Sequence, residues 1–175
     1  MAQKVILYIA ESVDGYIARK DGRLDWLTPY EGQAEDYGYA DFLKTIGTVI
    51  MGHTTYRQVL SFGDFPYPEQ ACFVFSTDRS KERDEHVTFV RGNVAESLDR
   101  IRDQHTGDIW LVGGSILIDA FLKQDLIDEF IITTVPVLLG DGIPLFLPSG
   151  TEKSLHLVSV RSYAAGLVQT RYIRG

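Results

Sequence analysis

Short apolar runs alternate along this chain with segments whose apolar residues recur at helical spacing. The apolar runs predict strands at residues 5–10, 48–51, 72–76, 87–90, 109–112 and 129–135. The intervening segments predict helices at 34–45, from about Thr54, along the stripe Val94, Leu98, Ile101 and His105, and at 115–124. Strands that alternate with helices in this way indicate a parallel sheet covered by its crossover helices.

The C-terminal pattern is different from the rest. Two strand-like runs, 155–163 and 167–173, are joined by the sequence Ala-Ala-Gly, which predicts an antiparallel hairpin. The glycine- and proline-bearing stretches 28–33, 61–70 and 140–150 are expected to be loops around the sheet. We therefore expect an α/β fold with a mixed, mostly parallel sheet.

Length and charge narrow the class of protein. A chain of 175 residues suffices for one domain with a substantial core and is short for two, so we expect a single domain over residues 1–175. The formal net charge of −7 argues against a nucleic-acid partner, because a phosphate backbone requires a clustered basic surface. A small polyanionic ligand stays compatible with this charge, since a helix N-terminus and a few nearby cations bind an anion locally.

Cysteine and histidine usage gives no sign of a metal site. Cys72 is the single cysteine, so no internal disulfide or thiolate cage can form, and the histidines lack partners at metal-ligand spacing. The first apolar run ends before Glu11, too early to span a membrane, and no signal-peptide cleavage pattern follows it. We expect a cytoplasmic protein with no metal and no membrane partner.

The stretch DIWLVGGSILIDAFL, residues 108–122, carries the clearest candidate binding feature. Its apolar strand ends in Gly113 and Gly114, directly before Ser115 begins an amphipathic helix. Without Cβ atoms the two glycines let backbone N–H groups approach a ligand, and the helix N-terminus favours an anion such as a pyrophosphate. A tight turn without a ligand has the same pattern, and the GxGxxG fingerprint is absent.

Two other strand ends carry small or polar residues of the same kind. They are Gly52, Thr54 and Thr55 after the run at 48–51, and Ser76, Thr77 and Arg79 at the end of the run at 72–76. The threonines suit a helix N-cap, and hydroxyls beside a cation suit a phosphate or a ribose. Each end is also compatible with a capped turn. Three such ends favour a cofactor lying across the carboxyl ends of several strands.

Five segments together resemble successive blocks of the dihydrofolate reductase-like superfamily. More narrowly, they resemble the branch that contains the C-terminal reductase domain of the bifunctional riboflavin-biosynthesis deaminase/reductase. The segments are ESVDGYIARKDGRLDWL, TVIMGHTTYRQVL, CFVFSTDR, IWLVGGSILIDAFL and EFIITTVPVLLGDGIPLF, and they follow the family's order across nearly the whole chain. The resemblance implies a three-layer fold with a central, mixed, mostly parallel eight-stranded sheet flanked by helices. It also implies that NADPH binds extended across the strand ends.

The resemblance assigns the cofactor contacts to two groups of residues. Gly52, Thr54, Thr55, Gly113, Gly114, Ser115 and Ile116 would lie at the pyrophosphate, and Ser76, Thr77 and Arg79 would face the adenosine ribose and its 2′-phosphate. The Gly113–Gly114 bond is expected to be cis, as in dihydrofolate reductases. His53 stands where the family commonly has an arginine for the 2′-phosphate, so a preference for NADPH would rest on Arg79 and Arg57. His53 is equally compatible with an exposed polar residue in a turn.

Reduction of a C=N or C=O bond needs a proton as well as a hydride, so an acid is sought near the nicotinamide. Asp36 is the first candidate, because counting back from VIMG without gaps places it where dihydrofolate reductases have the carboxylate that binds the pterin. Glu11 and Asp14 follow the first strand, where the resemblance places a mobile loop over the nicotinamide. Glu35 is adjacent to Asp36 and could substitute for it. Both also suit solvated acids at a helix N-terminus, and Asp14 suits a turn.

Trp26 and Tyr37 are the candidate substrate contacts. The resemblance places Trp26 over the substrate side of the cleft, although a tryptophan beside leucines is more often a core residue. Tyr37, with Tyr30 and Tyr39, would stack on a planar heterocycle or fill a dimer interface. The Gly-Asp-Gly of the block LLGDGIPLF suits a tight turn that Pro144 stiffens. The resemblance makes this block typical of the riboflavin-type branch, where it leads into a subunit-facing edge, and so implies a homodimer.

These observations predict an NADPH-dependent reductase that delivers hydride to a small heterocyclic or carbonyl substrate. The nearest named activity is that of the 5-amino-6-(5-phosphoribosylamino)uracil reductase of riboflavin biosynthesis. Arg19, Lys20 and Arg23 form the only cationic cluster near the active-site loop for the sugar phosphate. Two alternatives stay open: a dihydrofolate reductase proper, which Asp36 favours, and a noncatalytic nucleotide-binding module.

Overall fold

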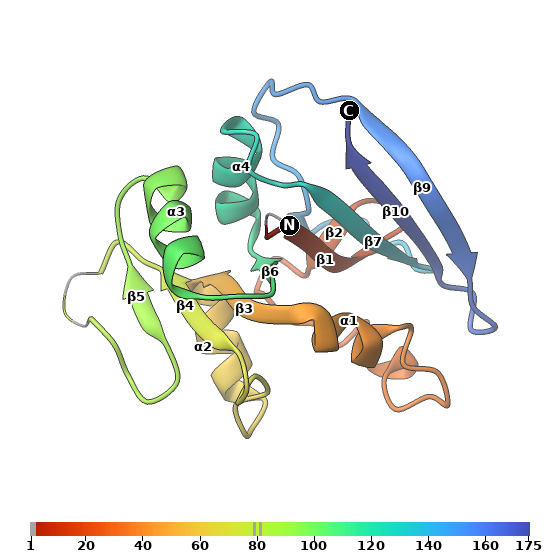
Figure 1. Ribbon diagram of the computed structural model, residues 1–175. Coiled ribbons are helices and arrows are strands. Elements are labelled where there is room, and N and C mark those ends of the chain that lie inside the picture. The colour runs from red at the N-terminus through yellow and green to blue at the C-terminus, as the bar shows by residue number, and fades with distance from the viewer. Residues whose placement is uncertain (1–2, 79, 81) are drawn as a thin grey trace.

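An eight-stranded sheet in the order β5-β4-β3-β6-β1-β7-β10-β9 organises the molecule (Figure 1). The computed structural model describes residues 3–78, 80 and 82–175. The strands are β1 (Val5–Ser12), β3 (Ile46–Gly52), β4 (Ala71–Phe75), β5 (Thr88–Val90), β6 (Asp108–Gly113), β7 (Glu129–Val135), β9 (Leu155–Ser162) and β10 (Val168–Arg174). The strands from β5 to β7 run parallel to one another, and β10 and β9 add an antiparallel edge.

Helices cover both faces of the parallel part of the sheet (Figure 1). They are α1 (Tyr39–Thr45), α2 (His53–Ser61), α3 (Val94–Gln104) and α4 (Ser115–Lys123). Val49 packs among residues of α1 and α2, such as Tyr56, whereas its neighbour Ile50 packs among residues of α3 and α4, such as Phe121. Both faces of a parallel sheet are therefore buried, which explains the nearly continuous apolar runs. The three-layer α/β fold with its mixed sheet and C-terminal hairpin is confirmed.

The expected helix at 34–45 begins at Tyr39 instead. Tyr37 and Gly38 adopt left-handed backbone conformations, with φ values of 55° and 80°, which cannot continue a right-handed helix. The carboxylate of Asp36 accepts hydrogen bonds from the N–H groups of Gly38 and Ala40, both at 3.0 Å. Asp36 therefore lies before α1 and not on it.

A small two-stranded sheet was missed by the sequence pattern. It pairs β2 (Tyr16–Ala18) with β8 (Ile143–Pro144), which lies inside an expected loop, and a short 3-10 helix η1 (Thr28–Tyr30) lies within another. A Cβ on Gly142 would collide with the carbonyl oxygen of Ala18, so glycine is required where the two segments meet. Elements this short contain too few positions for a periodic pattern to be detected.

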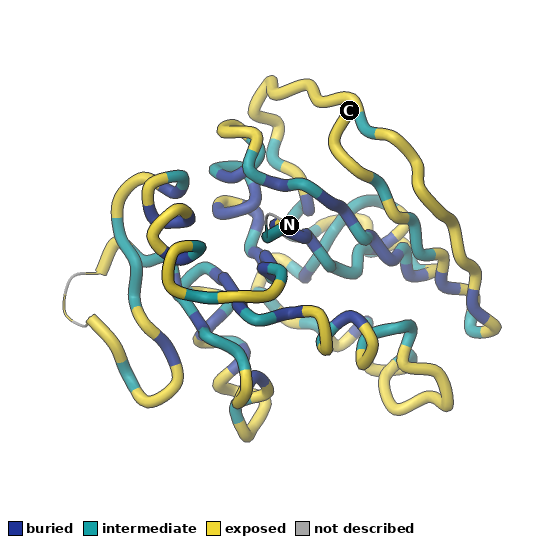
Figure 2. Tube along the Cα trace, in the orientation of Figure 1, coloured by how far each residue is buried: buried dark blue, intermediate teal, exposed yellow. Residues whose placement is uncertain are grey.

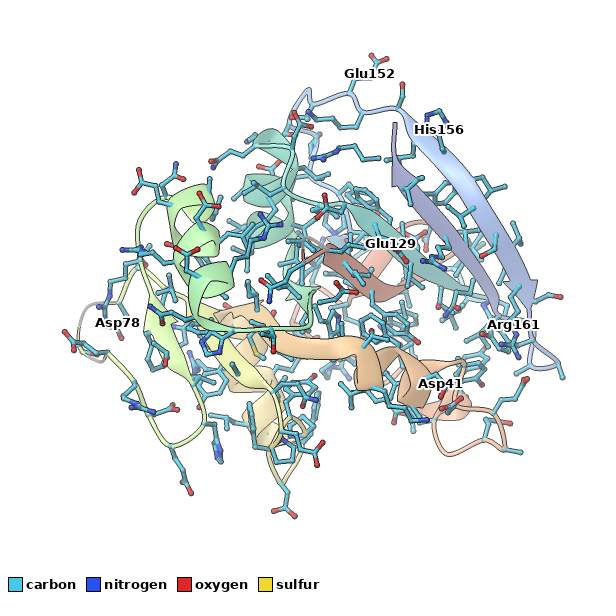
Figure 3. All side chains as sticks on the ribbon, viewed as in Figure 1. Asp41, Asp78, Glu129, Glu152, His156 and Arg161 are labelled. Atoms are coloured by element: carbon cyan, nitrogen blue, oxygen red, sulfur yellow. The ribbon has the colours of Figure 1, made fainter. Side chains whose placement is uncertain are left out.

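The antiparallel edge of the sheet is the most exposed part of the regular structure (Figure 2). Leu157 and Val160 of β9 expose 57% and 58% of their surfaces, and Val168 of β10 exposes 38%. Glu129 of β7, labelled in Figure 3, is a buried carboxylate. The guanidinium of Arg171 on β10 donates to its two oxygens at 2.5 and 3.0 Å. None of the helices in the described residues has the length and apolar character needed to cross a bilayer.

Candidate functional site

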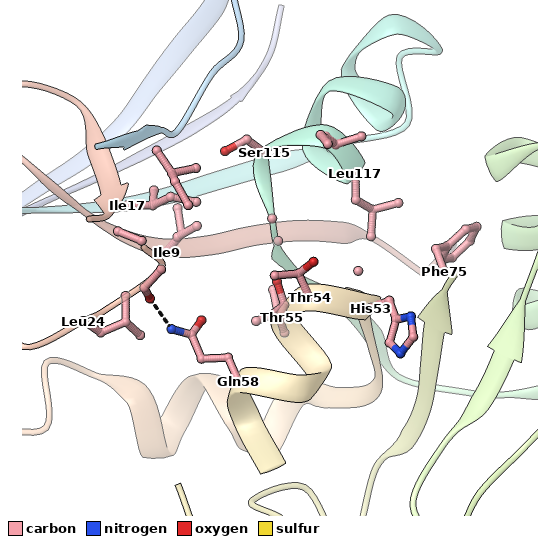
Figure 4. A pocket seen from close by; sticks show the side chains of 18 of the residues that line it. Ile9, Ile17, Leu24, His53, Thr54, Thr55, Gln58, Phe75, Ser115 and Leu117 are labelled. Atoms are coloured by element: carbon pink, nitrogen blue, oxygen red, sulfur yellow. Dashed lines mark hydrogen bonds between the residues drawn. The ribbon is translucent and has the colours of Figure 1, made fainter. Parts of the chain in front are cut away.

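A large cleft lies across the carboxyl ends of the parallel strands. Its volume is about 1380 Å³, and its walls come from the ends of β1, β3, β4, β5 and β6, from α2 and α4, and from the segment after β2 (Figure 4). Pockets for a single drug-sized ligand are typically about 300–1,000 Å³. The cleft therefore has room for a dinucleotide together with a second small molecule.

Two glycine-bearing bends face each other across the cleft floor. A Cβ placed on Gly52 would lie 3.7 Å from the backbone nitrogen of Gly114 and 3.8 Å from the carbonyl oxygen of Gly113. Gly113 has a φ of 129°, which side-chain-bearing residues rarely adopt, and the Gly113–Gly114 bond is cis, as the resemblance implied. The bends thus expose backbone on both sides of a narrow gap.

The helices that open into the cleft lack a side-chain acceptor for their first turns. The N-cap residues of α2 and α4 are Gly52 and Gly114, with no side-chain capping bond. By contrast, Asn93 caps α3 by accepting from Ala95 and Glu96, and Asp36 accepts the first N–H groups of α1. First-turn N–H groups without such a partner, at the positive end of a helix, form a binding site for an anion.

The β4 end of the cleft carries polar side chains. Nδ1 of His53 lies 3.1 Å from the hydroxyl oxygen of Ser76, which also accepts a hydrogen bond from the Asp78 N–H at 3.1 Å. Thr77 lines the same wall. Arg91 lines it too, and its Nε donates to the carbonyl oxygen of Asp78 at 2.8 Å. These residues form a polar region beyond the glycine bends.

Sequence analysis missed Arg91. The signal that could have found it is its position directly after β5, at the same carboxyl edge as the residues after β4. Arg79, expected in this role, lies outside the described residues. Arg57 is exposed on α2 and is not among the residues that line the cleft.

The expected pyrophosphate contacts all line the cleft: Gly52, Thr54, Thr55, Gly113, Gly114, Ser115 and Ile116. Ile116 is 80% exposed in the first turn of α4. Ser115 differs from the others, because its hydroxyl donates to the carbonyl oxygen of Pro144 and so attaches α4 to β8. The hydroxyl hydrogen of Ser115 is thus already used within the protein.

The structure does not bring the three predicted acids into the cleft. Asp36 is exposed and caps α1, and the hydrogen bond from the Ala40 N–H holds the pKa of its carboxyl below the usual range. Asp36 does not line the cleft. The helix that was expected to include it begins at Tyr39, three residues after Asp36. A catalytic role for Asp36 stays a prediction that its position does not support.

Glu11 and Asp14 also make contacts within the fold and do not line the cleft. Asp14 accepts hydrogen bonds from the Ser12 hydroxyl at 2.6 Å and from the N–H groups of Leu139 and Gly140, and these contacts lower the pKa of its carboxyl. Glu11 is half-buried on β1, where burial raises its pKa and a hydrogen bond with Thr134 opposes that rise. Asp14 therefore holds the loop after β7 against the end of β1, and Glu11 lies on β1 opposite Thr134 of β7.

Trp26 and Tyr37 lie beside the cleft and not in its lining. Trp26 is 5% exposed and packs in a cluster with Val135, Tyr163 and Leu167. This is the core position that a tryptophan beside leucines more often occupies. The hydroxyl of Tyr37 donates to the carbonyl oxygen of Tyr30 at 3.1 Å, and its ring meets Tyr163 edge-on at 5.1 Å. Direct substrate contact by Trp26 and Tyr37 stays a prediction that this placement does not support, because both side chains are used in packing.

The end of the cleft nearest β1 and β2 is mainly apolar. Ile9, Ile17 and Leu24 project into it from three different segments (Figure 4). Nε2 of Gln58 donates to the carbonyl oxygen of Gly22 at 2.5 Å, which ties α2 to the segment after β2. Sequence analysis did not identify these apolar lining residues, since isolated aliphatic positions carry no chemical signal.

Among the described residues, no group of three or more His, Cys, Asp or Glu side chains is arranged to hold a metal ion. Among the described lining residues, the ionisable ones are Tyr8, Asp21, Arg23, Asp25, His53, Asp78 and Arg91. The described lining offers a ligand backbone groups, these few side chains and several hydroxyl groups.

Comparison with known proteins agrees with this architecture. The RibD C-terminal domain family matches residues 67–169. The uncharacterized protein YwjB of Bacillus subtilis (strain 168) is 43% identical over 175 residues, which cover 99% of this chain and 99% of the relative. A structure from Shewanella sp. PV-4, described as a candidate riboflavin biosynthesis protein, has 34% identity and a TM-score of 0.87 and covers 100% of this chain and 99% of that one.

More distant structures share the fold. The diaminohydroxyphosphoribosylaminopyrimidine deaminase/5-amino-6-(5-phosphoribosylamino)uracil reductase of Thermotoga maritima has a TM-score of 0.76 and 16% identity, and covers 99% of this chain and 57% of that one. Dihydrofolate reductase from Enterococcus faecalis, complexed with NADP(H) and RAB-propyl, has a TM-score of 0.69 and 20% identity, with coverage of 98% and 96%. At these identities the likeness establishes the fold and not the substrate.

Proposed function

The chain belongs to the RibD C-terminal domain family, and we propose that it is an NADPH-dependent reductase acting on an electrophilic carbon of a small heterocyclic or carbonyl compound. The observation that carries the proposal is the pair of facing glycine bends, each at the uncapped N-terminus of a nine-residue helix in one large cleft. This arrangement fits the diphosphate of a dinucleotide, because it offers backbone N–H groups without competing side chains.

The proposed cofactor contacts follow from the cleft lining. Gly52, Thr54, Thr55, Gly113, Gly114, Ser115 and Ile116 would hold the pyrophosphate. Ser76, Thr77, His53 and Arg91 would face the adenosine ribose and its 2′-phosphate. A guanidinium binds a phosphate through two parallel hydrogen bonds, so Arg91 takes over part of the role first expected of Arg79.

The bound nicotinamide would supply a hydride to the substrate carbon. The chain's part is to orient the two reactants and to keep the apolar end of the cleft free of competing nucleophiles. The carboxyl groups in the described lining at that end, Asp21 and Asp25, are exposed and paired with arginines. Tyr8 also lines the cleft, but its hydroxyl donates to the carbonyl oxygen of Tyr37 at 3.3 Å. We therefore propose that water donates the proton to the substrate after hydride transfer.

The homodimer expected from the sequence is proposed to form through the β9 edge of the sheet. An edge strand presents unpaired backbone groups, and this one also carries exposed apolar side chains, Leu157 and Val160 among them. A second copy of the chain would cover these groups, as closed symmetric pairs commonly do.

Calorimetry with NADPH and NADH, followed by a substrate panel, tests the proposal. The panel contains dihydrofolate, the phosphoribosylamino-uracil and simple carbonyl compounds, and the absorbance of the reduced nicotinamide reports turnover. We expect heat with NADPH and oxidation with at least one compound. Absence of heat with both nucleotides would refute the cofactor site, and binding without oxidation across the panel would favour a noncatalytic nucleotide-binding module.

A further inference from the structure

The wall of the cleft at the end of β4 holds a histidine that is hydrogen-bonded to a serine. We propose that this pair, His53 and Ser76, makes the preference for NADPH over NADH depend on pH, with NADPH favoured more strongly as the pH falls. The inference rests on the proposed function, in which both residues face the 2′-phosphate. NADH is the natural reference ligand, because it lacks that phosphate.

Residues that follow β4 and lie within β5 fix the position of the His53 ring. His53 is the first residue of α2, and its side chain lines the cleft on the side of Phe75 (Figure 4). Its Nδ1 lies 3.1 Å from the hydroxyl oxygen of Ser76, which also accepts a hydrogen bond from the Asp78 N–H at 3.1 Å. The ring also packs edge-on against Phe89 of β5, with the centroids 5.8 Å apart. The imidazole is therefore held in this wall by the protein itself.

Protonation of the ring changes how many hydrogens the pair offers to a ligand. A hydroxyl donates one hydrogen bond and accepts up to two, and a neutral imidazole carries one N–H. In the neutral pair, one of these two hydrogens forms the bond between His53 and Ser76, whichever ring nitrogen carries the proton, so one donor is left. In the imidazolium, Nδ1–H donates to the Ser76 oxygen, and both Nε2–H and the serine hydroxyl hydrogen are left. Protonation therefore adds one donor and one positive charge.

The charged side chains around His53 keep their charge through the neutral pH range. The Asp78 carboxylate, which interacts electrostatically with His53, accepts a hydrogen bond from the Ser80 N–H at 2.8 Å, and this contact holds the pKa of Asp78 below its usual range. Arg91 on the same wall and Arg57, one turn along α2, carry guanidinium groups that stay protonated. Histidine is the side-chain type that ordinarily changes charge between pH 5 and pH 8. Among the described residues of this wall, the pH-dependent charge is therefore that of His53.

The two nucleotides differ at the group that this pair would meet. NADPH carries a phosphate on the 2′ oxygen of its adenosine ribose, and NADH carries a hydroxyl there. A charge-assisted hydrogen bond from the protonated pair stabilises a phosphate more than a neutral hydroxyl. The phosphate itself gains its second negative charge near pH 6, which strengthens its binding as the pH rises. Because these two effects have opposite signs, a variant without the imidazole is needed to separate them.

Titration calorimetry of the wild type with NADPH and NADH at pH 6.5 and pH 8.5 tests the inference. We expect the Kd for NADPH to rise about fivefold between these pH values, less than the roughly tenfold of one charge-assisted hydrogen bond because the phosphate ionisation opposes it. The Kd for NADH should change by less than about twofold. A Kd for NADPH that is constant or falls with rising pH would overturn the inference, whereas absence of NADPH binding at both pH values would refute the proposed function itself.

Proton uptake gives a second readout that needs no variant. Titrations at pH 7 in two buffers with different ionisation enthalpies measure the number of protons that bind together with the nucleotide. We expect uptake of a fraction of a proton with NADPH and none with NADH, because the phosphate favours the charged imidazole. NADPH binding without proton uptake would overturn the inference.

Variants at position 53 assign the effect to the imidazole. His53→Gln keeps a polar side chain that does not titrate, so its Kd for NADPH should stay constant or fall slightly from pH 6.5 to pH 8.5, without proton uptake. His53→Arg supplies a permanent cation and should bind NADPH at pH 8.5 about as tightly as the wild type does at pH 6.5. The matched control is His156→Gln on β9, outside the cleft lining and far from Asp78 (Figure 3), which should keep the wild-type pH profile. A folded His53→Gln protein with the wild-type pH profile and proton uptake would overturn the inference.

Discussion

Replacement of Gly52 by alanine separates the proposed binding role of the glycine bend from its role in folding. The backbone of Gly52 has φ −77° and ψ 162°, an extended conformation that alanine adopts freely. The added Cβ would stay 3.7 Å from the nearest backbone atom, so no clash arises within the protein. The variant should therefore fold with little net change in stability, because the gain of about 0.4–1 kcal/mol from the more restricted unfolded chain is opposed by the poorer preference of alanine for an N-cap position.

The same Cβ would stand between the two bends, where the diphosphate is proposed to lie. Loss of one charge-assisted hydrogen bond there would cost about 1.5–3 kcal/mol. At about 1.4 kcal/mol per tenfold change, the Kd for NADPH would rise roughly 10- to 150-fold. Titration calorimetry gives the Kd, and thermal unfolding without nucleotide gives the stability.

Arg57→Ala is the matched control for this experiment, because Arg57 lies on the same helix but not in the cleft lining. It should leave the Kd within about twofold, since exposed residues without a ligand contact contribute little. A Gly52→Ala protein that folds normally and binds NADPH as tightly as the wild type would refute the assignment of the diphosphate to this gap.

Three further predictions address other parts of the molecule. Arg91→Ala should weaken NADPH about tenfold while changing NADH affinity less, because the lost contact is to the 2′-phosphate; equal losses for both nucleotides in calorimetry would contradict this role. Burial raises the pKa of Glu11, so its ionisation destabilises the fold as pH rises from about 4.5 to neutral. Glu11→Gln should therefore raise the Tm more at pH 7 than at pH 4, and an equal shift at both pH values in thermal melts would count against it. Val160→Asp should convert the proposed dimer to a monomer in light scattering, because the charge would lie in the apolar β9 edge, whereas Glu152→Gln in the exposed preceding loop should not. A monomeric wild type would remove the dimer.

The strands and their glycine ends were predictable because they depend on local chemistry. The run before Gly113 and Gly114 forms β6, and α4 begins at Ser115 as expected. A buried parallel strand needs continuous apolar residues, and a sharp bend into a helix needs glycine; both requirements are visible within a few positions. The candidate cofactor residues of the described chain consequently line one cleft.

The positions of the acidic and aromatic candidate residues relative to the cleft were harder to predict from the sequence. Counting back from β3 to Asp36 assumed an uninterrupted helix, but the left-handed Tyr37 and Gly38 break it. The apolar neighbours of Trp26 indicate burial without showing which cluster it joins. Ile9, Ile17 and Leu24 meet only because β1, β2 and the following segment fold toward one another.

The sequence by itself determined the order of strands and helices, the positions where each strand ends, and the resemblance to a reductase family. Tertiary structure decided which side chains face the cleft and which are used in packing or capping. The physical reason is that hydrophobic periodicity reports how deeply a position is buried along one element, whereas the contents of a cleft depend on which distant elements pair. The acids outside the cleft and the apolar wall inside it both follow from those long-range pairings.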